Sequence, residues 1–222
     1  MFKPLFTASL VALSLAAPLA YAHQAGDIIV RAGVATVDPQ EDSSALTLNG
    51  GRLGGKAGLD SDTQLGLAGA YMLTDHIGIE LLAATPFSHT VTVKGLGGLD
   101  GKLADIKHLP PTLSLQYYPM APASAFQPYV GAGLNYTLFF DEDLTSERKA
   151  AGFSNLELDN SIGLALQVGM DYSLTEHLLF NASVWYVDID TTATTDLAGA
   201  GKVKVDVDID PFVYMVGLGY KF

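Results

Sequence analysis

The chain of 222 residues carries a formal net charge of −12, from 24 acidic and 12 basic residues. Such acidity excludes binding of nucleic acid through a general basic surface, and we expect no nucleic-acid partner. Cysteine is absent, which excludes a disulfide framework and thiolate metal ligands. Hydrophobic residues still make up 49% of the chain, and the mean hydropathy of +0.27 is high for a soluble acidic protein.

Residues 1–22 have the pattern of a secretory signal peptide. One lysine precedes an apolar run over residues 5–19, and the segment ends in the small-x-small cleavage pattern AYA. The run is too short to span a bilayer comfortably, and it contains Pro18. We therefore expect cleavage after Ala22 and a single domain over residues 23–222.

Eight segments of the remaining chain alternate apolar side chains with small or polar ones. Because successive side chains of a strand point to opposite faces, each segment would form a strand with one continuously apolar face. Repeated alternation over about ten residues, with turn residues between, is the pattern of a transmembrane barrel. In chain order the segments are 27–37, 63–72, 77–85, 109–118, 127–140, 161–172, 178–190 and the C-terminal strand ending at Phe222.

The connections between these segments alternate in length. Both termini would lie on one side with the shorter connections, namely 73–76, 119–126 and 173–178. The long connections would all lie on the other side, and they are 38–62, 86–108, 141–160 and 191–202. Outer-membrane barrels have this asymmetry, with short periplasmic turns and long extracellular loops.

No apolar stretch of the mature chain has the length of a transmembrane helix, and only helices and closed barrels satisfy their backbone groups in lipid. The sequence therefore predicts an all-β fold, an eight-stranded antiparallel up-and-down transmembrane β-barrel. Tyr220 and Phe222 would lie at the periplasmic interface, with both termini in the periplasm. A soluble β-sandwich or lipocalin-like barrel is the alternative, with the apolar face turned inward around a core.

An eight-stranded barrel has an interior just wide enough for side chains or one small ligand. Many positions opposite the lipid face are glycine or alanine, while Leu82, Trp185 and Met215 would line the interior with apolar surface. A narrow apolar lumen favours slim hydrophobic molecules over ions or sugars. Alternatively, the small residues relieve crowding in a tightly curved barrel, and both interpretations fit the pattern.

Five aspartates near the outer ends of two neighbouring strands form a candidate divalent-cation site. Carboxylate oxygens are the ligands that calcium and magnesium prefer, so these side chains could bridge through a cation to anionic lipopolysaccharide. The alternative is a solvated rim that keeps the strand ends out of the membrane. The residues are Asp188, Asp190, Asp206, Asp208 and Asp210.

Nothing in the sequence demands catalysis, and no cofactor is expected. The segment GGRLGGKA (50–57) approaches a phosphate-binding loop, but Ala57 stands where serine or threonine must hold magnesium. The five histidines fall in turns and loops without metal-ligand spacing. A lipid-acting barrel enzyme would need a catalytic group at the outer rim; His89 and His108 could lie near Asp141 there, but no spacing fixes that geometry.

Several segments together resemble the OmpW family of Gram-negative outer-membrane proteins, over essentially the whole mature chain. They are HIGIELLAATPF (76–87), KHLPPTL (107–113), FQPYVGAGLNYTLFFD (126–141), SVWYVDIDTTA (183–193) and the terminal GYKF. The resemblance implies an eight-stranded outer-membrane barrel whose hydrophobic lumen passes small hydrophobic molecules from outside, with lateral release into the bilayer as one exit. It also implies that Leu82 and Trp185 form the apolar constriction of the lumen.

Two functions remain in competition. The first is passive uptake of small hydrophobic molecules. The second is a structural or surface-receptor barrel, linked to stress response or to bacteriocin or phage adsorption, whose lumen would be plugged by charged side chains. Inward charges are few, namely Arg31, Glu80, Asp171 and Lys221. Expected partners are outer-membrane lipid, lipopolysaccharide and, through the strand that ends at Phe222, the barrel-assembly machinery.

Overall fold

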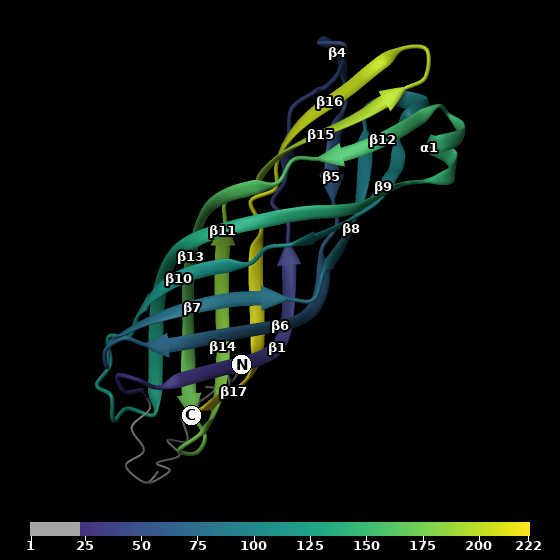
Figure 1. The fold of residues 1–222 in the computed structure, drawn as a ribbon. Helices are drawn as coiled ribbons and strands as arrows, with labels where there is room; N and C mark the ends of the chain where they lie inside the picture. Colours follow the sequence, from purple (N-terminus) through teal and green to yellow (C-terminus); the bar gives the residue numbers. More distant parts are fainter. Residues whose placement is uncertain (1–22) are drawn as a thin grey trace, which may run out of the picture.

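The computed structural model describes residues 23–222, so the predicted signal peptide lies outside the described residues. Eight strands form a closed antiparallel ring in chain order, and the last strand pairs with the first (Figure 1). This is the up-and-down barrel that the alternation predicts. The strands are β1 (Ile28–Asp38), β6 (Asp62–Met72), β7 (Ile77–Ala84), β10 (Thr112–Tyr117), β11 (Phe126–Leu144), β13 (Ser161–Ser173), β14 (Leu178–Val187) and β17 (Phe212–Lys221).

The long connections are folded as strands, which corrects the expectation of loops. Together with the outer part of β11 from Leu138, they continue the barrel outward, and we call this part the extension (Figure 1). Its elements are β2 (Asp42–Ser43), β3 (Leu46–Leu48), β4 (Gly51–Gly54), β5 (Lys56–Leu59), β8 (Phe87–Lys94), the 3-10 helix η1 (Gly97–Leu99), β9 (Gly101–Leu109), α1 (Ser146–Ala150), β12 (Phe153–Leu158), β15 (Asp190–Leu197) and β16 (Gly201–Asp208).

The same two-residue period builds the extension. In β16, which reads GKVKVDVD, the valines at 203, 205 and 207 are buried and the residues between them are exposed. These valines join one apolar core that runs down to Trp185 and Met215 inside the barrel. The extension is therefore a continuation of the barrel interior.

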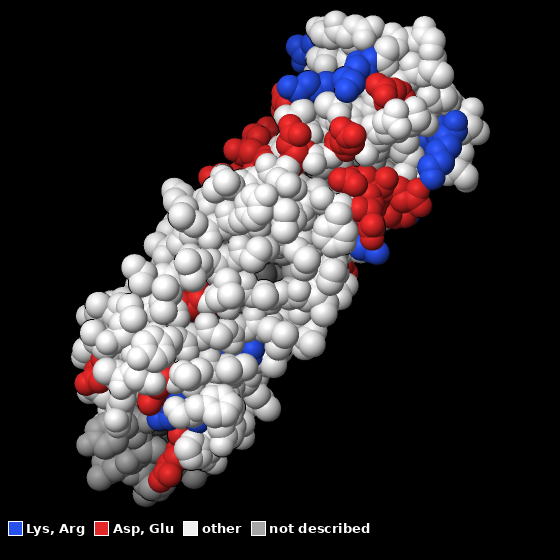
Figure 2. Space-filling model, in the orientation of Figure 1, with Lys and Arg blue, Asp and Glu red and all other residues white. Residues whose placement is uncertain are grey.

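The outer surface of the barrel is a band of exposed apolar side chains. On β13, Ile162 is 75% exposed and Leu164 is 64% exposed, values that a water-covered surface would rarely tolerate in a continuous row. Figure 2 shows few charged side chains over this band and a belt of acidic ones where the extension begins. Exposed aromatic residues lie at the opposite end, as a membrane-interface girdle requires: Tyr71, Tyr117, Tyr172, Tyr220 and Phe222.

Among residues 23–222, no helix is long and apolar enough to cross a membrane.

The inward glycines let strands and side chains approach closely. A Cβ atom on Gly33 would lie 2.6 Å from the Cα of Gly217, and one on Gly133 would lie 2.6 Å from the Cα of Ser114. At Gly131 the space is taken by the side chain of Gln167. Of the two interpretations of the small residues, the structure supports relief of crowding at these positions.

We expect Gly33→Ala to destabilise the barrel, because the new methyl group would collide with the backbone of β17. The expected loss in the free energy of unfolding is about 1–3 kcal/mol, the usual effect of overpacking. Gly69→Ala is the matched control, since a Cβ there meets nothing within 4 Å. Urea unfolding of each variant in lipid vesicles measures the two free energies of unfolding. Equal losses in Gly33→Ala and Gly69→Ala would contradict the close approach of β1 to β17 at Gly33.

Candidate functional site

Three apolar cavities follow one another down the inside of the molecule. The outer cavity has about 590 Å³ of unfilled space, the middle cavity about 490 Å³ and the inner cavity about 460 Å³, each including space open to solvent. The outer and middle cavities share part of their walls, including Leu46, Val93 and Leu103. Most apolar residues of the three linings belong to the same core, so the three cavities lie within one apolar interior that runs from the extension into the barrel.

The inner cavity lies where the extension joins the barrel. Val213 and Met215 of β17 line it together with Leu82 of β7. Two of the three predicted lumen residues, Leu82 and Met215, therefore line a cavity. Trp185 is 1% exposed and lies opposite Val213 in the pairing of β14 with β17, so it packs beside the lining.

A buried polar network fills the barrel below the inner cavity. Arg31 donates from Nη1 to Glu80 Oε2 (2.7 Å) and from Nε to Asp171 Oδ1 (3.0 Å). Gln167 donates to the second oxygen of Glu80 (2.9 Å), and His23 Nε2 lies 3.0 Å from Asp171. The remaining members of this group, which we call the ionic plug, are Gln116, Tyr118 and Asn181.

The ionic plug closes the periplasmic half of the barrel. Arg31, Glu80 and Asp171 are each 1% exposed, so the few inward charges noted in the sequence meet at one level. The fourth, Lys221, lies near the periplasmic end, 3.7 Å from Asp27. The functional residues predicted from the sequence did not include Gln116 and Gln167. Both alternate with the lipid-facing residues of β10 and β13, and this alternation would have identified them as inward polar groups.

The barrel wall has a gap beside the inner cavity. The pairing of β7 with β10 ends at Leu82 and Thr112, and the pairing of β8 with β9 begins at Phe87 and His108. Ala84 and Pro110, which lie between these pairs on the two sides, both line the inner cavity. Figure 2 shows an opening in the uncharged wall, at the height where β7 ends and β10 begins in Figure 1.

The edges of this gap leave few backbone groups without partners. Pro110 and Pro111 have no backbone N–H group. The interruption of strand pairing therefore leaves no unpaired backbone donor at these two residues. Their carbonyl oxygens accept hydrogen bonds from Asn135 Nδ2, at 3.1 Å and 3.3 Å. We call this gap the side opening.

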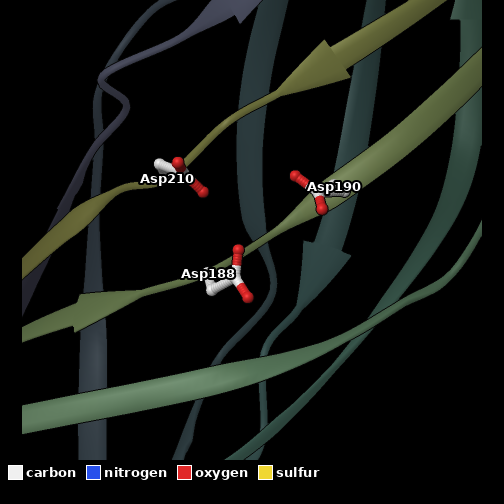
Figure 3. Close-up of side chains that lie close together, drawn as sticks. All are labelled: Asp188, Asp190 and Asp210. Atoms are coloured by element: carbon white, nitrogen blue, oxygen red, sulfur yellow. The ribbon is translucent and has the colours of Figure 1, made fainter.

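Three of the five predicted rim aspartates come together. Ligand oxygens of Asp188, Asp190 and Asp210 lie within 4.8 Å of one another (Figure 3). Asp208 is opposite Asp190 in the pairing of β15 with β16. Asp206 is not part of this group of three, and its carboxylate accepts from the Thr192 hydroxyl (2.8 Å) and lies 3.2 Å from Lys204 Nζ.

The surroundings shift the pKa of two of these carboxyl groups in opposite directions. Burial, and then the neighbouring carboxylates, raise the pKa of Asp190 above its ordinary value. The hydroxyl of Thr192 and the ammonium of Lys204 lower the pKa of Asp206. Crowding of negative charge is therefore concentrated at Asp188, Asp190 and Asp210, where a divalent cation would relieve it.

Two histidines that the sequence placed in loops lie on strands instead. His89 of β8 and His108 of β9 stack with their ring centroids 4.9 Å apart. Asp141 does not approach them, because its carboxylate pairs with Lys107 Nζ (3.0 Å) on the outer surface. The arrangement of His89 and His108 with Asp141 is therefore not formed, and the aspartate that lies beside His89 is Asp60, with Oδ1 3.9 Å from Nδ1.

Comparisons with known proteins agree with this architecture. The OmpW family profile matches residues 24–222. Outer membrane protein W of Vibrio cholerae is 52% identical over 97% of this chain and 96% of its own length. Outer membrane protein W of Escherichia coli is 47% identical over 99% of this chain and 100% of its own. The crystal structure of OprG from Pseudomonas aeruginosa has a TM-score of 0.88 and 61% identity, over 91% of this chain and 98% of that one.

We expect Arg31→Met to lower the free energy of unfolding by about 3–5 kcal/mol, because it leaves two buried carboxylates without their cation. Lys107→Met removes an exposed ion pair and should cost within about 1 kcal/mol. Urea unfolding in lipid vesicles, followed by the fluorescence of the single tryptophan, compares the two. Equal effects would mean that the ionic plug contributes no more than a surface pair.

The two shifted aspartates should give opposite dependences of stability on pH. Above the ordinary aspartate pKa, the folded state keeps a proton on Asp190 longer than the unfolded chain does, so the free energy of unfolding falls as pH rises through that window. The folded state loses the proton of Asp206 at a lower pH than the unfolded chain does. The free energy of unfolding therefore rises as pH rises towards the ordinary aspartate pKa. Asp190→Asn should make the fall shallower and Asp206→Asn the rise shallower, in urea midpoints measured with chelator between roughly pH 3 and 6.

The same variants test the cation hypothesis. Calcium added at neutral pH should raise the urea midpoint of the wild-type protein and should have a smaller effect on Asp190→Asn. Asp206→Asn is the matched control, because its carboxylate already has Lys204 as partner. No rise in the wild-type protein, with lipopolysaccharide present or absent, would leave the three aspartates as a solvated rim.

Proposed function

The chain belongs to the OmpW family of outer-membrane β-barrel proteins, and on that premise we propose that it is a passive uptake barrel for small hydrophobic molecules. In this proposal cargo enters the extension, passes through the outer, middle and inner cavities, and leaves through the side opening into the bilayer. The observation that carries it is the position of the inner cavity, above the ionic plug and beside the gap in the wall.

The lining of the route supports an apolar cargo. Its walls are mostly Leu, Val, Ile, Ala and Phe side chains, with few polar groups to replace the water around an ion or a sugar. The charged side chain in these linings is Arg148 of the outer cavity, which donates to the backbone carbonyls of Lys102 and Asp100. Burial of apolar surface contributes about 25 cal/mol per Å², so a hydrocarbon chain enters such a route favourably. Because acyl chains are as apolar as these walls, the step from the inner cavity to the bilayer needs no energy source.

The ionic plug supports a lateral exit. A molecule that crossed the periplasmic half would have to separate Arg31 from Glu80 and Asp171. Leaving those charges buried and unpaired would cost several kcal/mol, whereas the side opening has no charged side chain in its lining. The lower barrel is thus better suited to holding the wall together than to conducting cargo.

A surface-receptor barrel is the second candidate, and the ionic plug also favours it. A plugged lumen is what such a barrel would have, and its extension presents acidic and basic side chains to the exterior (Figure 2). Two partners belong to the proposal under either function. Lipopolysaccharide would be bridged by a cation at Asp188, Asp190 and Asp210, and the assembly machinery would bind the C-terminal strand through Phe222, whose side chain is 68% exposed.

Cells that carry the protein should take up labelled n-dodecane faster than cells without it, while uptake of a sugar stays unchanged. Ala84→Trp would fill the inner cavity at the side opening and should return dodecane uptake to the level of cells without the protein. Ala182→Trp is the control, since this alanine lies on the outer face of β14 away from the cavity. Folded protein in the outer membrane is quantified for each.

Two outcomes would contradict the proposal. If wild-type cells gain no dodecane uptake, the receptor function is favoured. If Ala84→Trp takes up dodecane as fast as wild type, the route does not pass the side opening.

A further inference from the structure

Within the part of the chain that the structure describes, one side chain in the wall of the inner cavity has a polar atom without a hydrogen-bond partner. Only His108 and Thr112 among the lining residues have polar side-chain atoms. The Thr112 hydroxyl donates to the carbonyl oxygen of Pro110 (3.1 Å) and accepts from Asn135 Nδ2 (2.9 Å). His108 Nδ1 is buried and has no partner among the described residues.

The ring of His108 is held in a fixed orientation. Its ring stacks on the ring of His89, with centroids 4.9 Å apart and an interplanar angle of 17°. It also stacks on the ring of Phe87, with centroids 5.5 Å apart and an angle of 23°. Phe139 approaches to 5.8 Å between ring centroids. Because three rings confine it, His108 cannot readily rotate to find another partner for Nδ1.

His89 leaves a second unpartnered nitrogen in the same stack. Its Nδ1 donates to the backbone carbonyl of Asp60 (2.5 Å), and a carbonyl can only accept, so Nδ1 carries the hydrogen. In the neutral ring Nε2 is then an acceptor, and it is buried without a partner among residues 23–222. Both rings are neutral, because burial lowers the pKa of His89 and burial, with His89 nearby, lowers the pKa of His108 to about 3.

Unpartnered buried nitrogens are unusual. A buried donor or acceptor without a hydrogen bond costs about 1–3 kcal/mol, and folded proteins leave few of them. Here His108 is part of the wall of an apolar cavity that lies beside the side opening. A molecule in this cavity that brings one polar atom within hydrogen-bonding distance of Nδ1 would recover that cost.

We propose that His108 is the hydrogen-bonding subsite for one neutral oxygen-bearing group, a hydroxyl or carbonyl, on an otherwise apolar cargo molecule. This rests on the proposed function and narrows its cargo from hydrocarbons in general to molecules such as alkanols. A neutral imidazole can donate to a carbonyl or accept from a hydroxyl. A carboxylate or ammonium group is disfavoured, because it would lose its hydration in a cavity without a counter-charge.

The test compares 1-decanol with n-decane on the full barrel in lipid nanodiscs, after subtraction of partitioning into nanodiscs without protein. His108→Leu should weaken decanol binding by about three- to tenfold, the net contribution of one hydrogen bond, and leave decane binding unchanged. His108→Asn places an amide near the position of Nδ1 and should retain most of the decanol affinity. His177→Leu is the control, since this exposed histidine lies at the far end of the molecule.

A second measurement does not depend on the folding of a variant. In protein labelled with ¹⁵N-histidine, decanol should shift the ring nitrogen resonances of His108, and decane should not. Unshifted resonances, or equal loss of decane and decanol affinity in His108→Leu, would overturn the subsite. Wild-type protein that binds both molecules equally well also overturns the subsite alone, whereas failure to bind either one contradicts the proposed uptake function itself.

Discussion

The whole structure depends on closure of the hydrogen-bonded ladder, because an unpaired backbone group in lipid costs several kcal/mol. The pairing of β10 with β11 and of β1 with β17 closes the ring and removes every sheet edge from the band. The ladder is interrupted beside the inner cavity, where prolines remove the donors and Asn135 satisfies the carbonyl groups of Pro110 and Pro111. An opening is tolerated there because little is left unpaired.

Closure also divides the interior into two parts with different chemistry. In the lower half, glycines let large polar side chains meet at the centre, as where the ring of Tyr129 occupies the space at Gly169. Above it, valines, leucines and alanines leave unfilled apolar space. The ionic plug thus makes the periplasmic half rigid and closed. In the proposed route, the apolar half has two exits, the extension and the side opening.

The sequence predicted what depends on a period of two and missed what depends on register between distant strands. Alternation alone placed all eight strands and turned Leu82, Trp185 and Met215 inward. It could not bring Arg31 to Asp171, which is 140 positions away, or stack His89 on His108. The strands of the extension were interpreted as loops because their charged outer faces hid the alternation, as in β16. Nor could alternation show that the Asp206 carboxylate accepts from Thr192 and lies beside Lys204.

If the proposed route is to conduct, His108 must bind cargo weakly enough for the cargo to leave through the side opening. A bond that held cargo tightly would turn the inner cavity into a trap, and an entirely apolar wall would not distinguish an alkanol from an alkane. One neutral hydrogen bond contributes about 0.5–1.5 kcal/mol, which slows release by at most about tenfold. A single charge at the position of His108 would bind its counter-ion far more strongly and would need to be desolvated first. A neutral imidazole beside the opening is therefore suited to selecting cargo without retaining it.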